Sequence, residues 1–142
     1  MPSSEPVNWQ PLSQLSLVAA LIDDACEGTQ NQRQILTEAR ERPHLLDDAT
    51  LDRVERVYGE QMEFLAIYEQ QIQRWRSASP SAAQSREMDR LAAETQTLRT
   101  ATTELLALAT ELRKGTIDRI REASDLQLGL QALLGNLPPR RC

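Results

Sequence analysis

The sequence is poor in glycine, histidine, cysteine and aromatic residues. Its 142 residues include five glycines, one histidine and two cysteines, and aromatic residues make up only 4%. Neither a glycine-rich phosphate loop nor a serine nucleophile elbow is present, which removes two common signatures of catalysis. With so few aromatic residues, any core must consist of Leu, Ile, Val, Ala and Met, which suits packing of helix on helix. No run of alternating β-branched residues predicts a strand.

The sequence also lacks clustered positive charge. The net charge is −5, and the 16 basic residues, of which only Lys114 is a lysine, are interspersed with Glu and Asp. Affinity for nucleic acid depends on clustered Lys and Arg, so a nucleic-acid partner is not expected. Arg140 and Arg141 form the only basic pair outside a predicted helix, and two charges are too few to hold an anionic membrane.

No membrane-spanning or secretory segment is predicted. The apolar stretch from Leu17 to Ile22 is too short to cross a bilayer, and no positive residue precedes it. Cys26 lies in a helical pattern and Cys142 is the last residue, so we expect two free thiols, as in a reducing cytoplasm. The sequence therefore predicts a cytoplasmic protein without a membrane partner.

The abundant residues are Ala, Leu, Gln, Glu and Arg, which lose little side-chain freedom in a helix. The predicted fold is all-α: an elongated antiparallel bundle of three long helices plus a short C-terminal helix, with heptad-like seams. Residues 1–10 are predicted to be a flexible N-terminal arm, from which Trp9 docks on the end of the first helix. Residues 11–135 form a single helical-bundle domain, and residues 136–142 a flexible C-terminal tail.

The first predicted helix runs from about Leu12 to Arg42, and Pro43 ends it. Its apolar residues recur at steps of three and four, which makes one apolar stripe. Residues 28–32 (Gly-Thr-Gln-Asn-Gln) are polar or poor helix formers. This weak middle predicts either a kink or a polar layer.

The second predicted helix, from about Leu51 to Arg76, follows the N-cap candidates Asp47, Asp48 and Thr50. A seven-residue repeat builds its seam, which consists of Leu51, Val54, Tyr58, Gln61, Leu65, Tyr68, Ile72 and Trp75. Further apolar residues flank this seam and widen the apolar arc to about 200°, beyond the ~100° that a surface helix needs. We therefore expect this helix to contact neighbours on two sides.

The third predicted helix follows a capping box, Ser81 to Gln84, and runs to about Arg113. Its seam consists of Met88, Leu91, Thr95, Leu98, Thr102, Leu105, Ala109 and Leu112. Lys114-Gly115 is either a stop or a bend, and the sequence leaves this open. A second capping box at Ser124 begins a short helix of about ten residues, which we expect to fold over one end of the bundle.

Two acidic pairs have the spacing of metal ligands on a helix: Asp24 with Glu27, and Glu60 with Glu63. They resemble the carboxylate pairs with which all-helical nucleotide pyrophosphohydrolases of the MazG and dUTPase-like type hold magnesium. The further Glu-x-x-Asp pair of those enzymes has no counterpart after Glu63, and both pairs occupy heptad positions that face away from the apolar seams. We therefore interpret them as solvated acidic faces, and we predict no cofactor.

The other reactive side chains do not form a catalytic set. A ferritin-like di-iron centre needs Glu-x-x-His on two helices, whereas His44 is the only histidine and lies in a predicted connector. Cys26 lies beside an apolar stripe with no base signalled nearby, which is typical of a buried structural thiol. The leucine repeat of the third helix has no basic region ahead of it, which excludes a DNA-binding zipper.

The sequence therefore favours protein–protein interaction: a helical scaffold or adaptor that self-associates, most simply as a dimer. The residues expected to make contacts outside the monomer core are Val57, Phe64, Ile67, Leu106 and Leu108. The last predicted helix has the form of a docking helix, although we favour packing on its own bundle; its leucines are Leu130, Leu133 and Leu134. Two alternatives stay open: an export or assembly chaperone that holds an amphipathic client helix, and a metal-dependent phosphohydrolase that uses the carboxylate pairs.

Overall fold

The computed structural model describes residues 7–42 and 46–133, without the side chains of 116–123, 131 and 132. A 3-10 turn at Leu12–Gln14 precedes three α-helices: α1 (Leu15–Glu41), α2 (Asp48–Arg76) and α3 (Ala82–Leu133). No strand occurs in these residues. The predicted all-α fold with three long helices is confirmed.

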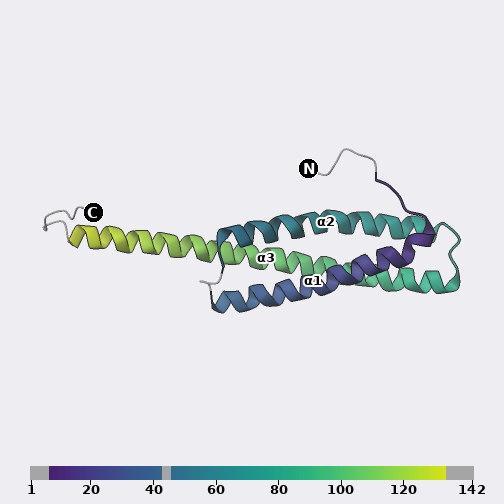
Figure 1. Ribbon diagram of the computed structural model, residues 1–142, viewed down its shortest axis with the longest axis horizontal. Coiled ribbons are helices and arrows are strands. Elements are labelled where there is room, and N and C mark those ends of the chain that lie inside the picture. The colour runs from purple at the N-terminus through teal and green to yellow at the C-terminus, as the bar shows by residue number, and fades with distance from the viewer. Residues whose placement is uncertain (1–6, 43–45, 134–142) are drawn as a thin grey trace.

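The helix α3 is the centre of the bundle. Both α1 and α2 pack along α3, and they approach each other far less closely. Successive helices run in opposite directions, and the C-terminal part of α3 projects past the ends of α1 and α2 (Figure 1). The bundle is therefore elongated, with one helix much longer than its two neighbours.

Ion pairs connect α3 to both of its neighbours. Arg33 of α1 lies 2.8 Å from Glu104, while Arg113 of α3 lies 2.6 Å from Asp52 and 3.0 Å from Glu55 of α2. Exposed pairs of this kind stabilise a fold by only ~0–1 kcal/mol each. Their greater effect is on register, since a shifted helix would place these charges opposite the wrong partners.

Local sequence signals set the helix ends. Asp47 caps α2 by accepting a hydrogen bond from the Thr50 backbone N–H at 2.8 Å. Ser81 and Gln84 form the predicted capping box of α3, in which each side chain accepts from the other residue's backbone N–H, at 3.1 and 2.8 Å. In the α2–α3 connector, Ser79 adopts a left-handed φ of 53°. Asp47, one of the three candidates for α2, and the box of Ser81 and Gln84 are therefore confirmed as caps, whereas the capping box predicted at Ser124 is wrong because this residue lies inside α3.

The residues just before α1 are tied to the end of α2. The Gln10 backbone N–H donates to Gln71 Oε1 at 2.7 Å, and the Gln10 carbonyl accepts from Trp75 Nε1 at 3.0 Å. The guanidinium of Arg74 lies over the Trp9 ring, 4.1 Å from its centroid. Trp9 therefore docks on α2, and the prediction that it docks on the first helix is wrong.

The core consists of two apolar clusters. The larger lies toward the α2–α3 connector, and its buried members are Leu15, Val18, Ala19, Ile22, Leu65, Ile72, Trp75, Met88, Leu91 and Leu98. The smaller lies toward the opposite end, and its buried members are Leu36, Leu51, Val54, Leu105, Leu108, Ala109 and Leu112. Most of these residues occupy the predicted seam positions, so the heptad pattern predicted the core well.

A polar layer separates the two clusters and joins all three helices. Gln61 of α2 donates from Nε2 to Thr29 Oγ1 of α1 at 2.9 Å and to Thr102 Oγ1 of α3 at 2.8 Å. Each threonine hydroxyl in turn donates to a carbonyl four residues earlier, that of Ala25 or Leu98. The weak middle of the first helix is therefore a polar layer, one of the two structures predicted for it.

The segment predicted as a short C-terminal helix is helical, but it is the end of α3. The helix passes through Lys114-Gly115 without a stop, and it does not fold over the bundle. Glycine in a helix interior costs only ~1 kcal/mol relative to alanine, which does not by itself end a helix. Residues 1–6, His44, Leu134, the tail 136–142 and Cys142 lie outside the described residues.

Candidate functional site

The carboxylate pairs considered as metal ligands lie on the surface. Asp24 and Glu27 of α1 and Glu60 and Glu63 of α2 are all exposed. Among the described residues, no group of three or more His, Cys, Asp and Glu side chains is placed to hold a metal ion. The structure therefore does not bring the four carboxylates together into a site.

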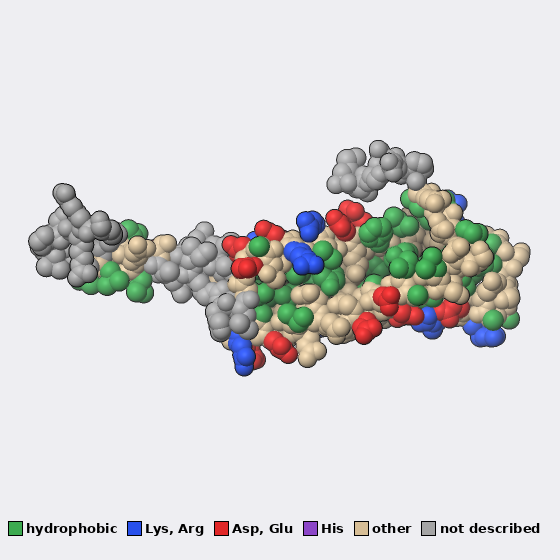
Figure 2. Space-filling model, in the orientation of Figure 1, with side chains coloured by type: hydrophobic (Ala, Val, Ile, Leu, Met, Phe, Trp, Pro, Cys, Tyr) green, Lys and Arg blue, Asp and Glu red, His purple; other side chains and the backbone are tan. Residues whose placement is uncertain are grey.

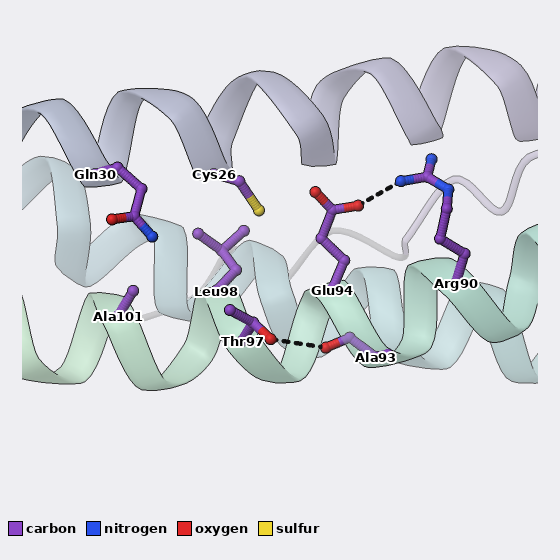
Figure 3. A pocket seen from close by; sticks show the side chains of 8 residues that line it. All are labelled: Cys26, Gln30, Arg90, Ala93, Glu94, Thr97, Leu98 and Ala101. Carbon is purple, nitrogen blue, oxygen red and sulfur yellow. Dashed lines mark hydrogen bonds and ion pairs between the residues drawn. The ribbon is translucent and has the colours of Figure 1, made fainter.

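A polar pocket lies between α1 and α3. A pocket of about 480 Å³ opens there, and it is lined by Cys26, Gln30, Arg90, Ala93, Glu94, Thr97, Leu98 and Ala101. Figure 3 shows the thiol of Cys26, from α1, facing the carboxylate of Glu94, from α3. The pocket thus combines a potential nucleophile with an acidic group.

Arg90 organises the charges at one end of this pocket. Its guanidinium donates to both oxygens of Asp23, at 3.1 and 3.3 Å, to Glu94 at 2.6 Å, and to Glu87. The hydrogen bond from Arg90 holds the pKa of Asp23 below its ordinary value, whereas burial raises the pKa of Glu94. The guanidinium is therefore already shared among three carboxylates.

The thiol of Cys26 is not activated. Burial and the neighbouring Glu94 raise its pKa to about 12, so it stays protonated at neutral pH. A nucleophilic cysteine needs the opposite: a base or a positive charge that favours the thiolate. We therefore interpret the pocket as a polar edge of the α1–α3 contact, held by ion pairs.

Exposed apolar side chains of α1 and α2 form a different kind of site. Leu17 and Leu21 of α1 and Val57 and Phe64 of α2 are all exposed, and we call them the α1–α2 surface. Residues four or seven apart share a helix face, so each helix contributes one apolar edge. Figure 2 shows hydrophobic side chains gathered between α1 and α2, mainly toward the end that carries the α2–α3 connector.

Contacts between α1 and α2 place these two edges side by side. The Tyr58 hydroxyl donates to the Gly28 carbonyl of α1 at 3.4 Å. Val57 lines a hollow together with Gln32, which belongs to α1. Leu21 lies seven residues before Gly28, on the same helix face. Leu21 and Val57 therefore lie on the sides of α1 and α2 that face each other.

The residues predicted to make contacts outside the monomer core fall into three groups. Val57 and Phe64 are exposed, and Ile67 and Leu106 are half-buried. Leu108 is only 7% exposed and belongs to the smaller core cluster, so the prediction that it lies outside the core is wrong. Because both α1 and α2 pack on α3, residues that flank its seam are covered too, and Leu108 is one of them.

The projecting end of α3, residues 114–133, carries the second exposed apolar group. Leu126, Leu130 and Leu133 are 69%, 52% and 78% exposed, and Leu128 is exposed on the other side of the helix. Leu130 and Leu133 belong to a segment that has the form of a docking helix. We predicted that this segment packs on the chain's own bundle, with docking on a partner as the alternative. The structure instead places these leucines beyond the ends of α1 and α2 (Figure 1).

Compared with known proteins, the chain matches no family model, no curated protein and no solved structure. Within residues 7–42 and 46–133, no helix is long and apolar enough to cross a membrane. The candidate function therefore depends on the surfaces of this molecule alone.

Proposed function

We propose that the chain is a non-enzymatic protein–protein interaction module: a cytoplasmic helical scaffold that self-associates as a homodimer. One observation carries this proposal. Among the described residues, most of the large apolar side chains that are exposed lie in two groups, the α1–α2 surface and the projecting end of α3, and only Val7 and Ile35 lie outside them. Apolar side chains that gather on a surface mark interaction sites far more often than single ones do.

The rest of the molecule supports this interpretation. Leu91, Leu98 and Leu105 of α3 are fully buried, so the bundle has a well-formed core. The leucines at the projecting end are therefore not needed to complete that core. The seams have the heptad spacing that coiled coils use, and this spacing serves contacts between chains as well as within one chain.

Molar mass in solution tests the proposal directly. Light scattering after size exclusion, over a concentration series from about 1 to 200 µM with reductant, is expected to show a mass rising from about 16 kDa toward twice that value. A polar substitution on the exposed face of α2, such as Gln70→Glu, serves as a control and should leave the curve unchanged. A monomer at every concentration would exclude self-association.

A second candidate, a chaperone that holds an amphipathic client helix, is favoured by the α1–α2 surface. Its two apolar edges border an open strip of the kind that helix-in-groove recognition uses. Calorimetry with a model amphipathic peptide is expected to show binding that Phe64→Gln weakens at least tenfold. Equal binding by the wild-type chain and by Phe64→Gln would remove this candidate.

A further inference from the structure

We propose that the projecting end of α3 is the self-association site, and that it pairs antiparallel with the same segment of a second copy. This inference rests on the proposed self-association and adds the surface and the orientation. Four observations carry it: the register of the exposed leucines, the charge of the segment, the position of α1 and α2, and the length of the contact.

The exposed leucines continue the seam of the bundle. Leu126 and Leu133 lie two and three heptads after Leu112, and Leu130 lies three heptads after Ala109. Up to Leu112 the seam is buried against α1 and α2, whereas the three leucines beyond it are mostly exposed. A straight helix drifts by ~20° per heptad, so these leucines still point broadly to the side on which α1 and α2 lie. The same seam is thus covered in one part and open in the other.

The charge of the segment favours a second copy as the partner. The whole chain carries a net charge of −5, so two copies repel each other over most of their surfaces. No charged residue occurs between Leu126 and Pro139. Two identical segments can therefore meet here without placing like charges opposite each other. An amphipathic partner with a charged rim would not require a segment free of charge.

The position of α1 and α2 decides the orientation. In a parallel pair, the seams of the two α3 helices would face each other along their whole length. The α1 and α2 helices of both copies would then occupy the same space, because they lie on the seam side of α3. In an antiparallel pair, the second copy's projecting end lies beyond the ends of α1 and α2, where neither of these two helices covers that side (Figure 1). Only the antiparallel arrangement avoids the clash.

Heptad packing then suggests the register. In antiparallel coiled coils the two seam positions alternate across the contact, which places Leu126 of one copy opposite Leu130 of the other. The contact between described residues spans about three helical turns, or roughly 16 Å. A contact this short buries much less surface than the ~800 Å² per partner of a standard interface. We therefore expect a reversible dimer whose population depends on concentration.

The test combines matched leucine substitutions with small-angle scattering, on the full chain with reductant present. Leu126→Gln with Leu130→Gln is expected to weaken dimerisation at least tenfold. Leu128→Gln removes an equally exposed leucine from the other side of the same segment, and it should leave the dimer unchanged. Helix content by circular dichroism, measured at a concentration where all three chains are monomeric, should be the same in both variants as in the wild type, since none of the three leucines is buried.

Scattering at high concentration measures the orientation. The antiparallel pair is expected to have a maximum dimension of roughly 140 Å, because two α3 helices of 52 residues overlap only at their ends. A dimer joined through the α1–α2 surface would be no longer than roughly 110 Å, since its bundles lie side by side. A dimer with a maximum dimension of roughly 110 Å or less overturns the antiparallel arrangement.

The outcomes separate this inference from the proposed function. If Leu126→Gln with Leu130→Gln dissociates the dimer while Val57→Glu with Phe64→Glu does not, the projecting end is the interface. If the reverse is found, self-association stands and the inference is wrong. A chain that is monomeric throughout the series overturns both.

Discussion

The helix α3 contains two regions with the same repeat and opposite surroundings. In residues 82–113 the seam leucines are buried between α1 and α2, and ion pairs such as that of Arg113 with Asp52 flank them. In residues 114–133 the repeat resumes at Leu126, but the leucines are exposed. A heptad pattern therefore identifies the apolar face of a helix, but it does not identify what buries that face.

The difference between the two regions follows from the lengths of the helices. The helices α1 and α2 have 27 and 29 residues, whereas α3 has 52. Two short helices can cover only part of a long one. The bundle part of α3 is therefore stabilised by contacts within the chain, while the described leucines at its projecting end lie beyond the reach of α1 and α2.

The largest expected effect is a difference in the free energy of unfolding between two leucine-to-alanine variants, one in each region of α3. Leu105→Ala should lower the free energy of unfolding by about 2–5 kcal/mol, because Leu105 is fully buried in the smaller core cluster. Leu126→Ala, measured at a concentration where the chain is monomeric, should change it by no more than about 0.5 kcal/mol. Urea unfolding followed by circular dichroism measures both values. Equal losses of unfolding free energy would mean that the two leucines are equally buried.

The polar layer of the bundle should give the next largest effect. Gln61→Ala removes the donor shared by Thr29 and Thr102, and it is expected to cost about 1–3 kcal/mol. Gln61→Leu fills the space without the hydrogen bonds and should cost less. If Gln61→Ala has no effect on the urea midpoint, water replaces the amide and the layer does not depend on this side chain.

Amide exchange should distinguish the two regions without any substitution. Amides of residues 91–112 are expected to be protected up to the global stability of the bundle, whereas those of 124–133 should exchange much faster at low concentration. A lone helix of this length is marginally stable in water. Raising the protein concentration should increase the protection of 124–133 alone; uniform protection along α3 at low concentration would contradict the comparison.

The smallest expected effect is the loss of stability in acid, and it should be confined to the bundle. The pKa values of Asp23 and Asp47 are lowered by the hydrogen bonds that they accept from Arg90 and from Thr50, respectively. Their contribution is therefore present above the ordinary aspartate value near 4 and is lost as the pH falls through the lowered values. Glu94, whose pKa burial raises, acts in the opposite direction. Urea midpoints between pH 6 and 3 measure the net effect, and Arg90→Gln should reduce it.

Much of the bundle could be predicted from sequence because its signals are local. Caps depend on residues three apart, such as Ser81 and Gln84, and the core follows a repeat that is visible in each helix separately. The polar layer was one of two structures predicted from residues 28–32 alone, the other being a kink. Its partner Gln61 could be recognised afterwards as the polar residue in the apolar seam of α2.

The features that were missed depend on contacts between distant parts of the chain. Trp9 binds α2 because Gln71 and Trp75 hold the neighbouring Gln10 backbone, and no local pattern indicates this. The pocket at Cys26 depends on how α1 and α3 are aligned. The path through Gly115 was ambiguous because a lysine-glycine pair occurs both at helix ends and within helices.

The continuity of α3 has a consequence for the geometry of any complex. One unbroken helix fixes the position of the leucines at its end relative to the bundle, both in distance along the helix axis and in rotation about it. One residue inserted after Gly115 would turn Leu126 by about 100° around the axis and move it ~1.5 Å outward. Seven inserted residues would nearly restore the angle while extending the helix by ~10 Å. Whatever binds this end is therefore held in phase with the core of the bundle.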